Sequence, residues 1–165
     1  MENSKFIIAV YVDNKAGVLT RVAAMFTRRN FNIDTLTVGE TECSEYSRIT
    51  ITMSGDDSVK TQLVNQLKKL YVVKKVEVLE HEPIKRELML IKVMNKPEDR
   101  SDIMTAVDVF RASVIDYSME SMCIEVTGNP SKIDAFVKLM EPYGILEMCR
   151  TGVVALDRGA STLMD

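Results

Sequence analysis

The segment best suited to ligand chemistry is a short polar stretch near the N-terminus. Residues 13–19 read Asp-Asn-Lys-Ala-Gly-Val-Leu, and helical periodicity begins at Val18. A helix N-terminus carries unpaired backbone N–H groups and a partial positive charge, so it can bind an anion such as an α-carboxylate. Gly17 would allow close backbone approach, and the Asn14 amide offers one acceptor and two donors. The stretch therefore predicts either a site for a free amino acid or an ordinary turn between a strand and a helix.

Residue types that usually carry catalysis or bind metals are few. His81 is the only histidine, and it stands between Glu80 and Glu82. Neighbours on a strand point to opposite faces, which favours a surface histidine over an acid–base pair. No phosphate-binding loop or nucleophile elbow occurs. The cysteines lack metal-ligand spacing and are expected to be reduced thiols: Cys43, Cys123 and Cys149. We therefore expect no catalytic residue and no bound metal.

The composition indicates a mildly acidic globular chain. Its 165 residues include 21 basic and 24 acidic side chains, with a formal net charge of −3, which argues against a nucleic-acid-binding surface. The longest apolar runs, such as residues 6–12, are too short to cross a bilayer. The N-terminus has Glu2 before its first basic residue, Lys5, unlike a secretory signal. We expect a cytoplasmic protein without nucleic-acid or membrane partners.

Apolar periodicity predicts six elements in the first half of the chain. Runs that are continuously apolar or alternate with period two predict strands, and apolar stripes at helical spacing predict helices. Asp56, Asp57 and Ser58 offer caps for the second helix. The predicted order is strand 6–12, helix 18–26, strand 33–38, strand 47–53, helix 59–70 and strand 72–79.

Pro83 ends this series, and the same order starts again after it. Ser101 can cap the third helix, and Asn129 can cap the fourth, where Pro130 takes the first helical position. The predicted elements are strand 88–94, helix 103–110, strands 112–117 and 122–127, helix 130–140 and strand 145–155.

The repeated order predicts an α+β fold of two ferredoxin-like βαββαβ domains in tandem. We place the first domain at residues 1–82, the second at residues 83–158 and a frayed tail at residues 159–165. Each domain would have a four-stranded antiparallel sheet with both helices on one face. The other face must be covered or exposed to solvent, and it could pair between the two halves, between chains, or both. We also expect a homodimer or a larger assembly.

Several stretches in both halves carry a family resemblance. They are NKAGVLTRV at 14–22, NFNIDTLTV at 30–38, SRITI at 47–51, RELMLIKV at 86–93, FRA at 110–112, IEVTG at 124–128, KIDAF at 132–136 and RTGVVAL at 150–156. The first half resembles an ACT domain. From about Phe6 to Gly159, the chain resembles the small regulatory subunit of acetolactate synthase, also called acetohydroxyacid synthase.

This resemblance implies a subunit without catalysis of its own. Such subunits activate a separate catalytic large subunit and confer feedback inhibition by valine, or sometimes by leucine or isoleucine. Thiamine diphosphate, magnesium and FAD would belong to that catalytic partner, and this chain would bind no cofactor.

The resemblance also implies an effector site between the ACT domains of two chains. The N–H groups of Val18 and Leu19 would take the carboxylate of the branched-chain amino acid, and Asn14 would meet Asn32 of the other chain. The positions that match the family's site are Asn14, Ala16, Gly17, Val18, Leu19, Asn32 and Ile33.

Other functions remain as alternatives at this point. An RNA-binding module of the same topology would stack bases on strand aromatics, and residues 47–53 contain none. A metal carrier would need two cysteines in its first loop, and residues 13–18 contain none. The main alternative is another ACT-domain amino-acid sensor that has no catalytic partner.

Overall fold

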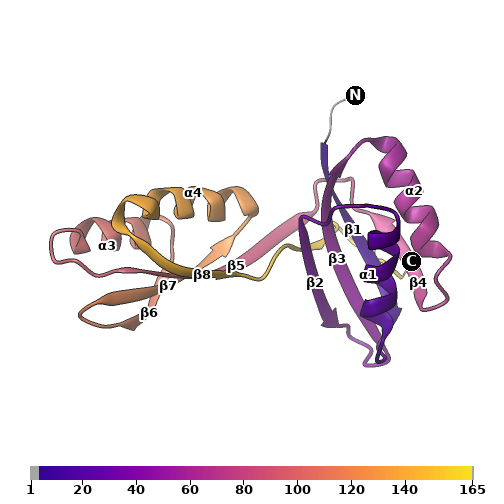
Figure 1. The fold of residues 1–165 in the computed structure, drawn as a ribbon, viewed down its shortest axis with the longest axis horizontal. Helices are drawn as coiled ribbons and strands as arrows, with labels where there is room; N and C mark the ends of the chain where they lie inside the picture. The colour runs from indigo at the N-terminus through magenta and orange to yellow at the C-terminus, as the bar shows by residue number, and fades with distance from the viewer. Residues whose placement is uncertain (1–3, 165) are drawn as a thin grey trace. The chain divides into compact units, whose positions relative to one another are not determined.

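The computed structural model describes residues 4–164 and divides them into two compact units. Among the described residues, the first unit comprises residues 4–84 together with 153–164, and the second comprises residues 85–152. Each unit has the predicted βαββαβ order, so the fold class is confirmed (Figure 1). None of the described helices is long and apolar enough to span a membrane.

The first unit is a four-stranded antiparallel sheet in the order β2-β3-β1-β4, with both helices on one face (Figure 1). The core lies between the sheet and the helices, where Val22 and Phe26 of the first helix meet Leu63 and Leu67 of the second. The elements are β1 (Ser4–Asp13), α1 (Val18–Arg28), β2 (Thr35–Glu40), β3 (Tyr46–Gly55), α2 (Asp57–Lys68) and β4 (Val73–Val78).

Strand β1 is buried on both faces, which explains its nearly continuous apolar run. Ile8 and Val10 face the helices, whereas Ile7, Ala9 and Tyr11 belong to a separate apolar cluster on the other face. That second cluster also contains Val153, Ala155 and Leu163 from the end of the chain. The C-terminal segment therefore covers part of the sheet face that the helices leave open.

The position of the C-terminal segment contradicts the predicted end of the second domain and the predicted frayed tail. Residues 153–158 were expected in the second domain, yet they group with the first unit. The described part of the predicted frayed tail, residues 159–164, contains Leu163, whose side chain is 8% exposed; Asp165 lies outside the described residues. The physical reason is that Val153, Ala155 and Leu163 bury apolar surface against β1.

The predicted final strand is also two strands, β8 (Ile145–Arg150) and β9 (Val154–Leu156). Gly152 lies between them with a φ of +83°, a conformation that favours glycine. Periodicity alone misses the interruption because both pieces are rich in apolar residues.

The second unit repeats the arrangement with the sheet path β6-β7-β5-β8. Met89, Ile91 and Val93 face the helices, and Leu88 and Leu90 on the opposite face are each more than one third exposed. The remaining elements are β5 (Ile84–Met94), α3 (Arg100–Val109), β6 (Ser113–Tyr117), β7 (Ser121–Gly128), α4 (Pro130–Met140) and a 3-10 turn (Glu141–Tyr143).

Predicted caps are confirmed at two of three helices, and of the three candidates before α2 the cap is Asp56. The Asp56 side chain accepts a hydrogen bond from the Val59 N–H at 2.9 Å, and Asn129 accepts one from the Lys132 N–H at 2.9 Å. The prediction for Ser101 is wrong, because α3 begins at Arg100 and Ser101 lies inside it; the cap position is Asp99, which makes no side-chain cap hydrogen bond.

A charged cluster lies inside the second unit. Glu87, only 2% exposed, accepts two hydrogen bonds from Arg150, from Nε at 2.7 Å and from Nη2 at 3.0 Å. Arg150 also donates from Nη1 to Asp134 at 2.8 Å. The bonds to Glu87, more than any other contact, raise the pKa of Arg150 above its ordinary value, so the guanidinium stays charged.

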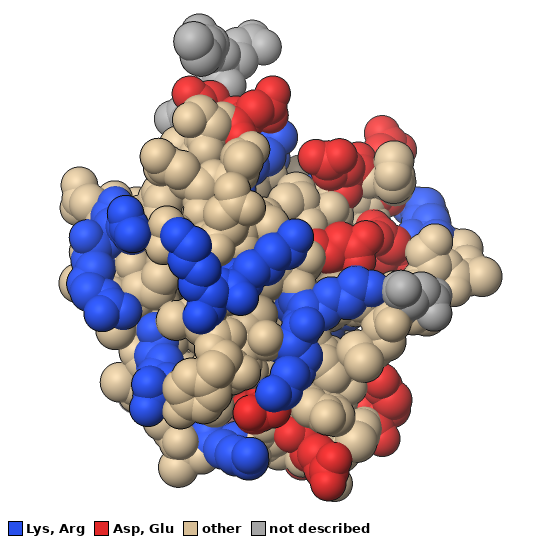
Figure 2. Space-filling view, turned by 90° about the vertical axis from the view of Figure 1, so that its right-hand side faces the viewer, with Lys and Arg blue, Asp and Glu red and all other residues tan. Residues whose placement is uncertain are grey.

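Basic side chains gather on one face of the first unit despite the acidic net charge. Figure 2 shows Lys and Arg across the face that carries α1 and α2, with acidic side chains around its margins. At this face the Arg21 guanidinium lies 4.9 Å from the ring centroid of Tyr71, which is 70% exposed. The net charge used in the sequence analysis did not predict this local clustering.

Candidate functional site

The predicted ligand loop joins β1 to α1, and its geometry depends on Gly17. Gly17 is the N-cap of α1 and has φ +83° and ψ −8°, in the left-handed region that other residues rarely adopt. A Cβ added there would meet no atom within 4 Å, so the space beside the helix start is open. The glycine is therefore required by the backbone conformation rather than by crowding.

The start of α1 leaves two backbone donors available. The Val18 N–H is within 3.4 Å of the Lys15 carbonyl, a long hydrogen bond, so this predicted donor is partly used. The N–H groups of Leu19 and Thr20 have no acceptor in the described chain. Thr20 was missed by the sequence analysis, although its place in the first helical turn is a signal that could have found it.

No side chain caps α1, in contrast to α2 and α4. The partial positive charge of the helix start therefore has neither a side-chain cap nor an acidic residue in the first turn of α1. An external carboxylate could accept from Leu19 and Thr20 here.

The structure narrows the expected role of Asn14. Its Nδ2 donates to the Ser44 carbonyl at 2.9 Å and lies 3.4 Å from Glu40 Oε2, so both donors tie the loop to the β2–β3 hairpin. Its Oδ1 accepts no hydrogen bond from the described residues. Asn14 can therefore accept from an ammonium group, but it is not placed to donate to the carboxylate as well.

The second unit contains an internal counterpart of this arrangement. Asn95 directly follows β5, just as Asn14 directly follows β1. The Nδ2 of Asn95 donates to the carbonyl of Ser118 in the β6–β7 hairpin. There, Oδ1 accepts from the Arg100 Nε at 2.8 Å. The amide oxygen therefore accepts from a cationic group in the second unit, whereas that of Asn14 accepts no hydrogen bond from the described residues of the first unit.

The remaining predicted residues are spread around the loop. Ala16 and Asn32 are exposed, Leu19 is 44% exposed, Val18 is buried and Ile33 packs partly against the core. Within one chain, no hydrogen bond or ion pair among the described residues joins Asn32 to Asn14. Their meeting across two chains requires a second copy and stays a prediction.

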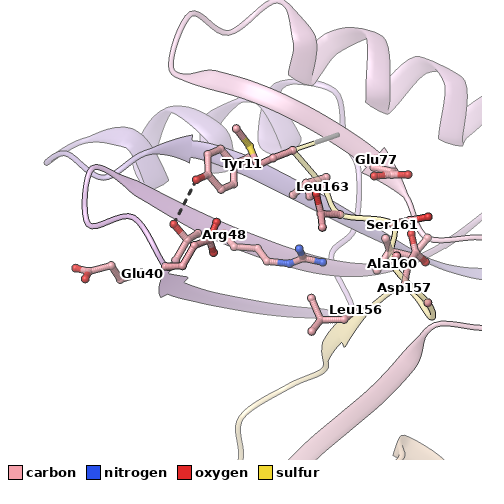
Figure 3. Close-up of a pocket in the computed structure, with 15 residues that line it drawn as sticks. Tyr11, Glu40, Arg48, Glu77, Leu156, Asp157, Ala160, Ser161 and Leu163 are labelled. Atoms are coloured by element: carbon pink, nitrogen blue, oxygen red, sulfur yellow. Dashed lines mark hydrogen bonds between the residues drawn. The ribbon is translucent and has the colours of Figure 1, made fainter.

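A cavity of about 750 Å³ lies on the other face of the same sheet (Figure 3). The sequence analysis missed it because its walls come from all four strands of the sheet, the loop after β2 and the C-terminal segment. Arg48 of β3 reaches into it and donates from Nη2 to the Ala155 carbonyl at 2.8 Å. Burial lowers the pKa of Arg48 below its ordinary value, and the nearby Asp157 carboxylate acts in the opposite direction.

Models of known protein families match the sequence of both units. Residues 8–75 match the model of the AHAS small subunit-like ACT domain, and residues 86–159 match the model of the small subunit of acetolactate synthase. The chain belongs to the acetolactate synthase small subunit family. The predicted resemblance is confirmed, and the ACT match contains the whole loop from Asn14 to Leu19.

Individual family members agree over almost the entire chain. A probable acetolactate synthase small subunit of Archaeoglobus fulgidus is 50% identical over 94% of this chain and 98% of its own length. The acetolactate synthase small subunit of Bacillus subtilis is 43% identical over 94% and 91%, respectively. The crystal structure of the small subunit from Thermotoga maritima superposes with a TM-score of 0.90 at 39% identity, covering 96% of this chain and 99% of that one.

Proposed function

We propose that this family member activates the catalytic subunit of acetolactate synthase and makes it sensitive to valine or another branched-chain amino acid. The uncapped start of α1 beside Gly17 supports this proposal most directly. It provides backbone donors for a carboxylate, and the free Oδ1 of Asn14 lies in the same loop. The family membership of the full chain supports a catalytic large subunit as its partner.

The proposed site recognises the groups that every free amino acid carries. The carboxylate accepts from the N–H groups of Leu19 and Thr20, and the ammonium donates to Asn14. Asn32 and Ile33 of a second chain complete the site. Hydrogen bonds to charged groups contribute about 1.5–3 kcal/mol each, and burial of one isopropyl group contributes about 1.5–3 kcal/mol. After the cost of association, these values suit a dissociation constant of roughly micromolar to millimolar.

A site shared by two chains links effector binding to the arrangement of the chains. A coupling free energy of about 1–3 kcal/mol between effector and partner contacts is enough for regulation. Thiamine diphosphate, magnesium and FAD belong in this proposal to the catalytic subunit.

The isolated chain is expected to form no acetolactate from pyruvate, even with thiamine diphosphate and magnesium. Adding it to the catalytic subunit should raise turnover several-fold, whereas an equal mass of an unrelated protein should not. A colorimetric acetolactate assay, combined with co-purification of the two subunits, measures both effects. Turnover by the purified chain alone would contradict the regulatory role, and failure to bind any catalytic subunit would favour a free-standing ACT sensor.

The chain is also expected to form at least a dimer through its first unit, because one copy supplies only half of the proposed pocket. Sedimentation velocity with and without valine measures the assembly. A species that stays monomeric while it binds valine would contradict the shared site.

A further inference from the structure

The cavity opposite the helices has the composition of a small-molecule site. Its volume of about 750 Å³ lies within the usual range for ligand pockets, roughly 300–1,000 Å³. Tyr11, Leu79, Leu156 and Leu163 provide apolar walls. Figure 3 shows charged side chains, among them Arg48 and Asp157, in the same cavity. All of these residues belong to the first unit.

Two oppositely charged groups in this cavity lack direct partners for their charges. Asp157 Oδ1 is buried and accepts no hydrogen bond from the described residues. Arg48 is half-buried, and among the described residues it donates only to the Ala155 carbonyl, although a guanidinium has five N–H donors. No ion pair of 4.0 Å or less joins the two among the described residues, and Figure 3 shows the guanidinium pointing toward the segment that carries Asp157.

Such a pair matches the two ends of an α-amino acid. A carboxylate can accept from Arg48, and an α-ammonium can donate to Asp157, which satisfies both groups at once. A buried charged group without a partner is costly, so a ligand that supplies both partners gains affinity.

The lining has an excess of negative charge. Glu40, Glu42, Glu77 and Asp157 contribute carboxylates, against the single guanidinium of Arg48. Neutral amino acids leave this excess unchanged, whereas a second cationic group on the ligand offsets it.

We propose that this cavity is a second amino-acid site, selective for a free α-amino acid with a basic side chain. The carboxylate binds Arg48, the α-ammonium binds Asp157, and the alkyl part of the side chain packs on Leu79 and Leu163. The side-chain cation lies among the remaining carboxylates. This site is separate from the loop of Asn14 and Gly17, although Glu40 lines the cavity and also contacts Asn14.

Calorimetric titration of the full chain with three matched compounds tests the ligand chemistry. L-lysine should bind, L-norleucine lacks the side-chain ammonium and should bind at least fivefold more weakly, and cadaverine lacks the carboxylate and should lose the contribution of Arg48. Equal affinity for lysine and norleucine would overturn the selectivity for a basic side chain. Absence of any lysine binding would overturn the site itself.

Two variants then locate the lysine site independently of the proposed effector loop. Asp157→Asn keeps the side-chain shape and should weaken lysine binding at least tenfold while leaving valine binding unchanged. Gly17→Asp should abolish valine binding and leave lysine binding intact. Asp108→Asn, on the exposed face of α3, is the control and should change neither. Unchanged lysine affinity in Asp157→Asn, or its loss in Gly17→Asp, would overturn the cavity assignment.

Discussion

Gly17→Asp is expected to raise the valine concentration for half-maximal inhibition of the reconstituted enzyme by more than about 100-fold. The new carboxylate would stand at the open start of α1 and repel the valine carboxylate. It would also compete for the N–H groups of Leu19 and Thr20. Loss of two hydrogen bonds to a charged group, at about 1.5–3 kcal/mol each, gives a change of this size.

Gly17→Asn is the matched control for the charge. Asparagine tolerates positive φ, as Asn30 does in this chain at φ +56°, so the backbone strain of the two variants is similar. Valine inhibition should weaken less in Gly17→Asn than in Gly17→Asp. Equal effects of the two variants would show that shape, and not charge, is what the loop recognises.

Asn14→Ala and Asn32→Ala are expected to weaken inhibition by about tenfold each, in line with one lost hydrogen bond. Activation of the catalytic subunit should survive in all loop variants. Lys68→Ala, at an exposed position near the end of α2, serves as the neutral control. Wild-type valine sensitivity in every loop variant would place the effector site elsewhere.

Arg150→Met is expected to destabilise the second unit by about 3 kcal/mol, the lower end of the range for breaking a buried ion pair, since Arg150 itself is partly exposed. The variant leaves the Glu87 carboxylate buried without its two donors. Urea unfolding followed by circular dichroism measures the change in the free energy of unfolding.

Two further variants distinguish the cost of an unpaired buried Glu87 carboxylate from the cost of losing a charge at the surface. Asp134→Asn removes the exposed partner of Arg150 and should cost less than about 1 kcal/mol. Glu87→Leu combined with Arg150→Met replaces the pair with apolar groups and should recover most of the lost stability. A loss in the double variant as large as in Arg150→Met alone would show that packing, and not the unpaired carboxylate, is responsible.

Local patterns predicted most of the fold. Helix α4 has the predicted bounds, residues 130–140, because Asn129 caps it, Pro130 fits its first turn and an apolar stripe runs along it. Strand β2 starts two residues later than predicted, at Thr35, because residues 31–33 form a loop after α1. Gly17 and the helix start beside it were also visible in the sequence, whereas the counterpart of Asn14 in the second unit, Asn95, was not identified there.

The features that depend on distant contacts could not be predicted. Nothing in the sequence places Arg150 against Glu87, 63 positions away, or Leu163 over the first strand. The cavity around Arg48 and Asp157 needs the C-terminal segment on the first sheet. The use of the Asn14 donors also depends on a hairpin that lies 26–30 positions further along the chain.

The most direct test of the proposed regulation is a valine titration of acetolactate formation by the catalytic subunit, with and without this chain. The catalytic subunit alone should have low turnover that valine barely changes. The mixture should turn over several-fold faster and be inhibited by valine at micromolar to millimolar concentrations, in keeping with a few charge-assisted hydrogen bonds. If the two proteins co-purify and neither turnover nor sensitivity to valine, leucine or isoleucine changes, the proposed function is wrong.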